Sequence, residues 1–413
     1  MKPEYFVRTI VLITFLFIID LYAYQAVKTI VSKSVHKNTA HYAYWLVSLL
    51  LMVWLVYSMA TFKKNAGIQQ FTLISAVIFA VYIAKLFMAF VLLGEDGFRV
   101  LEGIGKKIIG ANTNGFLHER RKFIAQLATG VGAIMLGAVA YGVTKGKYNY
   151  KIVRRSISFA DLPDAFDGFT ITQISDIHSG SFDNKAAVEH GIDLVNDQKS
   201  DVILFTGDIV NNIATELEPW KNSFSRLKAP MGVFSILGNH DYGDYINWDS
   251  AVEKENNLQK LIAMHRSMGF DILLNEHRTL QKSGQQINLV GVENWGKPPF
   301  PQYGDLSKAF RGATKQAFNI LMSHDPSHWR GEVLDFSQKI HLTLSGHTHG
   351  MQFGVEIPGW LKFSPVQWKY PEWADLYTEK ERYLYVNRGF GFLGFPGRVG
   401  IMPEITVITL KKA

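Results

Sequence analysis

The chain of 413 residues contains no cysteine, which excludes disulfide bonds, thiolate metal sites and catalysis by a thiol. Charged residues are also scarce: they make up 19% of the chain, below the ~25% of an average soluble domain. The sequence has no internal repeat, no low-complexity segment and no basic run interleaved with aromatic residues. Its net charge of +7 therefore does not predict a nucleic-acid partner, and nothing in it identifies a protein partner.

Charged residues are sparsest before about residue 145, and four long apolar stretches lie in that half. They cover about residues 9–27, 42–62, 71–93 and 123–143. A helix of ~20 apolar residues is long enough to span a lipid bilayer. We therefore predict an all-α transmembrane region over residues 1–145, with four helices and the membrane lipid bilayer as its partner.

Two ionisable residues fall inside these stretches, Asp20 in the first and Lys85 in the third. Both stretches run in the same direction, so the two residues should lie at similar depth. An isolated charge in a membrane is costly. The sequence therefore predicts either an intramembrane ion pair or two residues that each line a wet groove.

The basic residues between the stretches predict the orientation of the chain. Nine on one side (Lys28, Lys33, Lys37, Arg99, Lys106, Lys107, Arg120, Arg121 and Lys122) outnumber four on the other (Lys2, Arg8, Lys63 and Lys64). Loops rich in lysine and arginine stay in the cytoplasm. The prediction is a multi-pass protein of the bacterial cytoplasmic (inner) membrane with an extracytoplasmic C-terminal half, although five basic residues within 145–155 oppose it.

Arg120 and Arg121, followed by an apolar stretch, resemble a twin-arginine export signal. The pair is internal, and Glu119 precedes it, which departs from that pattern. The alternative is an ordinary basic flank of a membrane span. Both interpretations place the arginines in the cytoplasm.

Residues 146–413 follow a different pattern, in which short β-branched runs alternate with amphipathic segments. This alternation predicts an α/β fold in which helices cover a buried sheet. Strands are expected at 171–174, 202–205, 233–237, 287–292, 320–322, 341–344, 383–387 and 404–410, and helices at 185–198, 217–227, 251–268 and 327–336.

Polar residues cluster directly after five of the predicted strands: Asp176 and His178, then Asp208, then Asn239, His240 and Asp241, then His324, and last His347 and His349. The carboxyl ends of strands are where ligands bind in α/β sheets, so these clusters should converge. Asp, His and Asn offer the mixed oxygen and nitrogen ligands that suit Mn, Fe or Zn. Six or seven ligands are too many for one tetrahedral ion, so we predict two divalent metal ions that together assist a phosphoryl displacement.

This series of motifs resembles the calcineurin-like metallophosphoesterase superfamily, and within it the membrane-anchored bacterial branch that includes UDP-2,3-diacylglucosamine hydrolases. The resemblance implies a four-layer α/β/β/α sandwich. It implies one metal held by Asp176, His178 and His349, a second held by Asn239, His324 and His347, and Asp208 between them. A hydroxide bridging the ions would be the nucleophile, His240 would be the general acid, and Asp241 would orient the ring of His240. Asp241 could instead be a plain turn residue. Two positions depart from the branch, Asn211 and Met351, and these affect the expected substrate rather than the ligands.

Aromatic residues are dense in two proline-broken segments, 295–303 and 353–377, which include Trp295, Trp360 and Trp368. Proline prevents a regular helix or central strand there, so a long loop or ribbon is expected. The aromatics could simply pack this loop onto the domain. Alternatively, they form an apolar wall beside the metals that binds a lipid-linked or amphiphilic phosphoester or pyrophosphate.

Three other functions are compatible with parts of the sequence. The substrate could be a soluble nucleotide or a phosphorylated protein. The domain could be an inactive scaffold or receptor, although all seven ligands are present. A transporter with a regulatory domain is disfavoured, because the spans show no repeat symmetry.

Overall fold

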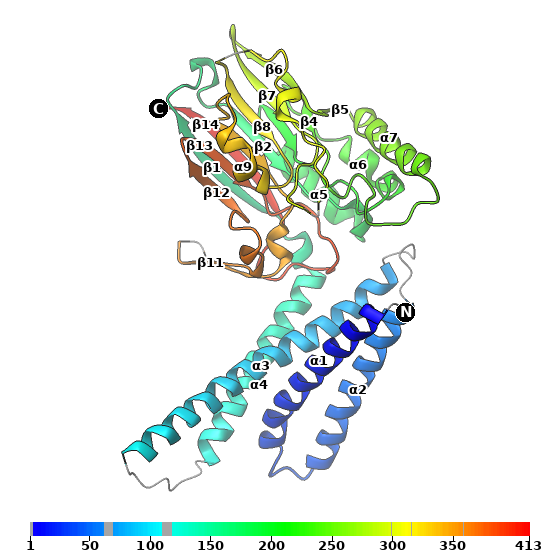
Figure 1. The fold of residues 1–413 in the computed structure, drawn as a ribbon, viewed down its shortest axis with the longest axis vertical. Coiled ribbons are helices and arrows are strands. Elements are labelled where there is room, and N and C mark those ends of the chain that lie inside the picture. The colour runs from blue at the N-terminus through cyan, green and yellow to red at the C-terminus, as the bar shows by residue number, and fades with distance from the viewer. Residues whose placement is uncertain (1–2, 62–68, 110–117, 299, 315, 358) are drawn as a thin grey trace. The chain divides into compact units, whose positions relative to one another are not determined.

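The computed structural model describes residues 3–61, 69–109, 118–298, 300–314, 316–357 and 359–413 (Figure 1). The chain divides into two compact units, Met1–Tyr141 and Gly142–Ala413. The division falls four residues before the boundary expected from composition, which was placed after residue 145.

The N-terminal unit consists of helices α1 (Pro3–Ile30), α2 (Lys37–Thr61), α3 (Gln69–Ile108) and α4 (His118–Thr144). Each contains a segment long and apolar enough to cross a membrane: Thr9–Ile30, Lys37–Met59, Ala76–Ile108 and Glu119–Thr144. The prediction of four apolar membrane helices is confirmed. Of the residues used to predict the orientation, Lys2, Lys63 and Lys64 lie outside the described residues.

Helix α3 continues 15 residues beyond the predicted end of its apolar stretch at residue 93. The extension carries charges at helical spacing, with Asp96 paired to Arg99 at 3.6 Å and Glu102 paired to Lys106 at 2.7 Å. Such i,i+3 and i,i+4 pairs stabilise a helix. Glu102 also lies 3.4 Å from Arg120 of α4, so one arginine of the paired motif contributes to packing within this unit.

Asp20 and Lys85 form an ion pair in the interior of the helical unit, as one of the two interpretations of the sequence predicts. The Lys85 ammonium lies 2.5 Å from the carboxylate of Asp20, which is fully buried. Tyr82 donates to the same carboxylate at 3.0 Å, and so does Ser48. Every oxygen of this carboxylate therefore has a partner.

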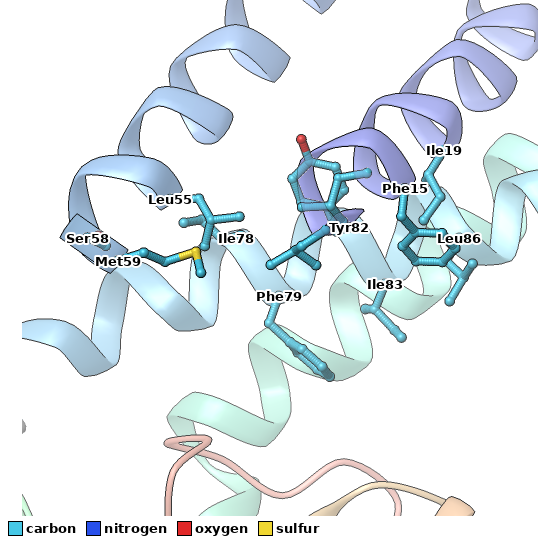
Figure 2. A pocket seen from close by; sticks show the side chains of 12 residues that line it. Phe15, Ile19, Leu55, Ser58, Met59, Ile78, Phe79, Tyr82, Ile83 and Leu86 are labelled. Atoms are coloured by element: carbon cyan, nitrogen blue, oxygen red, sulfur yellow. The ribbon is translucent and has the colours of Figure 1, made fainter. Parts of the chain in front are cut away.

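A cavity of about 470 Å³ opens among α1, α2 and α3 (Figure 2). Its lining is apolar except for Tyr82 and Ser58. The hydroxyl of Tyr82 is already bonded to Asp20, so the cavity offers few polar groups to a ligand.

The C-terminal unit contains two six-stranded sheets, and a buried core lies between them. In the first sheet the strand order is β1-β14-β2-β3-β4-β5, and in the second it is β12-β13-β9-β8-β7-β6. Ile171 and Leu204 of the first sheet share one core cluster with Leu289 and Leu344 of the second. The first sheet comprises β1 (Lys151–Phe159), β2 (Thr170–Ile174), β3 (Val202–Phe205), β4 (Val233–Ser235), β5 (Phe270–Ile272) and β14 (Glu404–Lys412). The second comprises β6 (Glu276–Lys282), β7 (Gln285–Gly291), β8 (Phe318–Met322), β9 (Leu342–Ser345), β12 (Asp375–Glu379) and β13 (Arg382–Val386).

Helices cover the outer face of each sheet and complete the predicted four layers. Ile203 and Phe205 of β3 pack with Val188 of α5 and Leu261 of α7 on one side. Leu321 of β8 packs with Trp329 of α9 on the other. The helices are α5 (Lys185–Asn196), α6 (Lys221–Phe224), α7 (Ala251–Ser267), α8 (Leu306–Ala309) and α9 (Ser327–Gly331). The four-layer α/β/β/α prediction is confirmed.

The sequence patterns miss several strands that are polar or lie at sheet edges. In β6 only Leu280 is buried, so the strand lacks an apolar run, and it is defined instead by the turn at Ser283 and Gly284, both with positive φ. Strand β1 lies at the edge of the first sheet and is largely exposed, so it also lacks an apolar run. The proline-broken segment contains a two-stranded ribbon, β10 (Val355–Ile357) and β11 (Leu361–Phe363), as the prolines predict.

Candidate dimetal centre

The candidate ligands leave the carboxyl ends of strands in both sheets. Asp176 and His178 follow β2, Asp208 follows β3, and Asn239 follows β4. His324 follows β8, and His347 with His349 follows β9. Strands β2, β3 and β4 run parallel, and so do β8 and β9, so each sheet presents its ligands at one edge.

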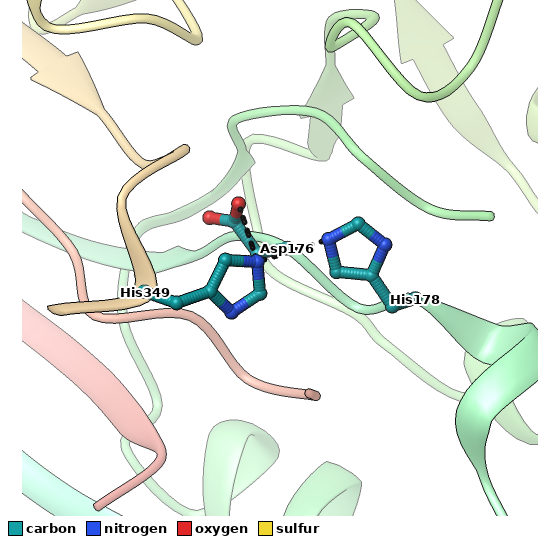
Figure 3. Close-up of side chains that lie close together, drawn as sticks. All are labelled: Asp176, His178 and His349. Carbon is teal, nitrogen blue, oxygen red and sulfur yellow. Dashed lines mark hydrogen bonds and ion pairs between the residues drawn. The ribbon is translucent and has the colours of Figure 1, made fainter. Parts of the chain in front are cut away.

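Asp176, His178 and His349 form a first buried group that could hold a metal ion (Figure 3). The Nε2 atoms of the two histidines are 3.0 Å apart, and His349 Nε2 is 3.2 Å from Asp176 Oδ1. The three ligand atoms all lie within 4.8 Å of one another. An Asp/His₂ set of this size suits a first-row divalent ion.

Asp208, His324 and His347 form a second group with the same spacing. His324 Nε2 lies 3.1 Å from Asp208 Oδ2, and Asn239 Oδ1 lies 2.8 Å from His347 Nδ1. The same Asp208 oxygen is 3.6 Å from His178 Nε2 of the first group. Asp208 therefore reaches both groups, and Asn239 adjoins the second.

Backbone carbonyls fix which nitrogen of two of the histidines faces the centre. Nδ1 of His178 bonds the Val210 carbonyl at 3.2 Å, and Nδ1 of His324 bonds the Thr206 carbonyl at 2.8 Å. Because each Nδ1 donates to a carbonyl, Nε2 is the nitrogen of each ring that faces the centre, as metal-binding histidines require. The buried Nε2 of His324 has no hydrogen-bond partner in the described chain. These residues fit divalent metal ions.

The electrostatics differ among the histidines of the cluster: burial alone would lower the pKa of His324, but the charge of Asp208 raises it to about 10. Burial lowers the pKa of His178 and of His347, so both rings are neutral. Burial alone would raise the pKa of Asp176 and of Asp208, but the neighbouring histidines hold both below the usual range. Neutral imidazoles and ionised carboxylates are the forms that bind a metal.

The backbone at the centre adopts conformations that side chains normally avoid. Five candidate ligands have positive φ: Asp176 (53°), His178 (49°), Asp208 (61°), His347 (72°) and His349 (50°). Strain of this kind costs about 1–3 kcal/mol per residue and concentrates at functional sites. Met351, one of the two positions that depart from the family branch, also has a positive φ of 55°.

Two glycines give the carboxylates their space. A Cβ on Gly346 would lie 2.2 Å from Asp176 Oδ2, and a Cβ on Gly238 would lie 2.2 Å from Asp208 Oδ1. Either contact is far shorter than packed atoms tolerate. The Gly-His and Gly-Asn steps in the sequence therefore have a steric reason.

His240 lies beside the two groups, but its partner is not the one predicted. Its Nδ1 lies 2.7 Å from the Asn211 carbonyl, and its ring centroid is 5.0 Å from that of His178. The prediction that Asp241 orients His240 is wrong. The Asp241 carboxylate instead accepts from the backbone N–H groups of Gly238 (2.8 Å), Asp208 (2.9 Å) and Ile209 (2.9 Å), so it joins the loops after β3 and β4. Burial and the charge of Asp208 raise the pKa of Asp241 to about 7.

Three aromatic residues lie at the centre, and two of them, Phe300 and Tyr370, belong to the aromatic segments that the sequence offered as a wall beside the metals. The Tyr370 hydroxyl is 2.8 Å from His347 Nε2, and the Phe300 ring meets His347 edge-on at 5.2 Å. Asn239 donates to the Tyr245 hydroxyl at 2.7 Å, and the Tyr245 ring lies 4.4 Å from that of His240. Tyr245 follows the Asn-His-Asp motif by four residues, but no pattern marks it.

Arg398 was also missed, because nothing in the sequence links it to the ligands. It is fully buried and donates to the carbonyls of Arg388 (2.8 Å) and Gly391 (2.6 Å), with Nη2 3.3 Å from His349 Nδ1. Arg398 therefore holds the loop that carries Gly389 against His349.

The three tryptophans predicted to contact substrate have different surroundings. Trp295 stacks on His328 with centroids 4.7 Å apart and packs over Gly331. Trp360 and Trp368 are 79% and 78% exposed. Trp368 lies two residues before Tyr370, whereas Trp360 lines a separate cavity that contains no candidate ligand.

Together, the four layers and the ligand set define a metal-dependent phosphoesterase. Residues 169–351 match the family model "Calcineurin-like phosphoesterase", and residues 6–147 match "Probable Calcineurin-like phosphoesterase, transmembrane domain". The chain belongs to the calcineurin-like metallophosphoesterases and carries an N-terminal four-helix transmembrane domain.

Its relatives include bacterial and animal proteins of this family. The uncharacterized metallophosphoesterase YkuE of Bacillus subtilis is 31% identical, over 71% of this chain and 97% of that protein. A zebrafish (Danio rerio) transmembrane protein with metallophosphoesterase domain is 28% identical, over 89% and 81%. The UDP-2,3-diacylglucosamine pyrophosphatase LpxG of Chlamydia trachomatis is 28% identical, over 56% and 81%.

Proposed function

We propose that this protein hydrolyses a phosphoester or pyrophosphate bond in a lipid-linked or amphiphilic substrate, with two divalent metal ions of the Mn, Fe or Zn type. The observation that carries the two-metal assignment is Asp208, whose Oδ2 lies 3.1 Å from His324 of one group and 3.6 Å from His178 of the other. Two ions held there would polarise the phosphoryl oxygens and lower the pKa of an attacking water.

In this proposal, Asp176, His178 and His349 hold one ion, and Asn239, His324 and His347 hold the other. Asp208 contributes to both. His240 handles the proton of the leaving group: Nδ1 donates to the Asn211 carbonyl, so Nε2 can take up a proton and pass it to the leaving oxygen. Asp241 acts through the backbone and positions the loops that carry Asp208 and Asn239.

Three observations support an amphiphilic substrate. Phe300 and Tyr370 place aromatic rings against the ligand His347. Trp368, near Tyr370 in the chain, exposes most of its apolar surface to solvent. Exposed apolar surface of this kind marks interaction sites. LpxG, one of the relatives, is named a UDP-2,3-diacylglucosamine pyrophosphatase, and a diacylated substrate is amphiphilic.

The test compares two substrates on the full-length protein. Trp368→Ala should reduce turnover of a lipid-linked pyrophosphate about tenfold or more, because it removes apolar contact area, and should reduce hydrolysis of p-nitrophenyl phosphodiesters far less. Val252→Ala, at an exposed apolar position on α7, is the matched control. Equal losses on both substrates, or faster turnover of soluble nucleotides than of any lipid, would contradict the proposal.

We also propose that the protein lies in the bacterial cytoplasmic membrane with its catalytic domain outside the cytoplasm, from the distribution of basic residues. A reporter active only outside the cytoplasm, fused after Ala413, should then be active. If Arg120→Lys with Arg121→Lys reduces export, the pair is an export signal. An inactive C-terminal fusion would show that the orientation is the reverse of the one proposed.

A further inference from the structure

A second cavity lies in the catalytic domain between the edge strand β1 and the ribbon of β10 and β11. Its volume is about 900 Å³. None of the candidate metal ligands, and neither His240 nor Asp241, lines it. The cavity is therefore a different feature from the dimetal centre.

The cavity carries an excess of positive charge. Five basic residues line it, namely Lys151, Arg154, Arg155, Lys362 and Arg388, against three acidic ones, Glu356, Asp375 and Glu404. The three carboxylates are already engaged. Arg155 binds Asp375 through two bonds of 2.8 and 2.6 Å, and Arg388 binds Glu404 and Glu356.

Three of the basic residues have no carboxylate partner among the described residues. Arg154 bonds only the neutral Gln198, at 2.7 Å, and Lys362 donates to the carbonyl of Ala374. Burial, together with the charge of Arg388, lowers the pKa of Lys362 to about 8. The Lys151 side chain, which also lines the cavity, is exposed and has no ion-pair partner among the described residues.

A buried donor in the cavity also lacks an acceptor. The Arg388 side chain is 5% exposed, and its Nε has no hydrogen-bond partner in the described structure. Unsatisfied buried donors are costly, and a bound anion relieves that cost.

The remaining lining is apolar and exposed. Ile357, Trp360 and Leu361 from the ribbon are 42%, 79% and 41% exposed, and Ile152 of β1 adjoins them. A pocket that combines unpaired cations with exposed apolar side chains is complementary to a ligand with an anionic head and an apolar tail. Because the chain carries a transmembrane domain, lipids of the bilayer are the source of such a ligand.

We propose that this cavity binds the phosphate head group of an anionic membrane lipid, with the tail against Ile357, Trp360 and Leu361. Lys151 and Arg154 contact the phosphate, and Arg388 Nε supplies a hydrogen bond. The site is a lipid-binding site separate from the dimetal centre, so it does not depend on the substrate proposed above.

Isothermal titration of the full-length protein in a nonionic detergent tests the proposal, with dihexanoyl phosphatidylglycerol as the monomeric probe. Lys151→Gln with Arg154→Gln should weaken its binding about 30-fold, because each cation near a lipid phosphate contributes about fivefold. Lys199→Gln with Lys228→Gln, two exposed lysines outside the cavity, should leave binding unchanged. Trp360→Ser should weaken binding about tenfold through lost apolar contact.

Three further arms identify the ligand and the site. Dihexanoyl phosphatidylcholine should bind more weakly than phosphatidylglycerol, and inorganic phosphate should bind more weakly than either. His347→Ala should bind phosphatidylglycerol as the unmodified protein does. Unchanged affinity in the Lys151/Arg154 variant, equal binding of the neutral lipid, tighter binding of free phosphate, or loss of lipid binding in His347→Ala would each overturn the proposal. Loss of lipid binding in His347→Ala would place the lipid at the metals. If instead the proposed substrate is wrong, the expected affinities for phosphatidylglycerol stay the same, so the two failures can be distinguished.

Discussion

Two buried clusters of charged residues, one in the helical unit and one in the sandwich, differ in whether their polar atoms are satisfied. Around Asp20, each carboxylate oxygen has donors: Lys85 at 2.5 Å, Tyr82 at 3.0 Å and Ser48 at 3.0 Å. Around Asp208, histidine nitrogens face one another and the carboxylates, and Nε2 of His324 has no hydrogen-bond partner in the described residues.

The difference separates a structural cluster from a functional one. A buried charge that is fully paired holds its surroundings in one arrangement and offers nothing to a ligand. A buried polar atom without a partner is costly until a ligand binds it. Burial alone therefore does not separate the two clusters, whereas the unpartnered Nε2 of His324 does.

The largest expected effect comes from breaking the second cluster at its shared ligand. Asp208→Asn removes a ligand charge from both groups, so phosphodiester hydrolysis should fall about 10⁴-fold, the equivalent of the several kcal/mol that metal ions contribute. Asp193→Asn, at a surface carboxylate bonded to Arg226, should retain full activity. If Asp208→Asn loses less activity than His178→Ala, Asp208 is not shared.

A smaller loss is expected when the metals are kept and only the proposed proton donor is removed. His240→Ala should lower turnover about 10²–10⁴-fold while metal content stays constant, because His240 contacts the ligands without belonging to either group. His190→Ala, at an exposed position on α5, is the matched control. Loss of a metal ion from His240→Ala would instead make this residue a ligand.

The paired cluster in the membrane helices should respond through stability rather than catalysis. Asp20→Asn or Lys85→Met alone should lower the free energy of unfolding by about 3–5 kcal/mol, since each leaves an unpaired buried charge or polar group. Asp20→Leu with Lys85→Met should recover most of that loss. Thermal unfolding in detergent measures both effects, with Asp96→Asn as an exposed control. Additive losses in the double variant would show that the two residues do not form a pair.

The smallest effect concerns a buried histidine outside both clusters. Burial lowers the pKa of His265 to about 3, and Ser235 is its hydrogen-bond partner at 3.0 Å. Because the unfolded chain binds the proton more tightly, the stability contributed by His265 is present above pH 6.5 and is lost as pH falls toward 3. Between pH 6 and 5 the unmodified protein should lose about 1 kcal/mol more than His265→Gln in chemical denaturation. Parallel pH profiles would contradict this.

Much of the fold and of the candidate site could be predicted from the sequence, because the controlling patterns are local. Apolar runs define the four membrane helices and the buried strands β2, β3 and β8, and each ligand motif directly follows such a strand. Strand β6, with one buried residue, and the charged extension of α3 lack that signal.

Contacts between segments distant in the sequence could not be predicted. Asn211, rather than the adjacent Asp241, holds His240, because the Asp241 carboxylate is already occupied by backbone N–H groups. Tyr370 and Arg398 reach their histidines from 23 and 49 residues away. The Asp20–Lys85 pair was one of two alternatives, which only the packing of α1 against α3 could decide.

Metal analysis of the active, full-length protein tests whether Asp208 joins two metal ions in one centre. We predict two divalent ions per chain and hydrolytic activity that rises with the second ion, with both ions depleted in Asp208→Asn. A fully active protein that holds a single ion, or an Asp208→Asn variant that keeps two, would contradict it.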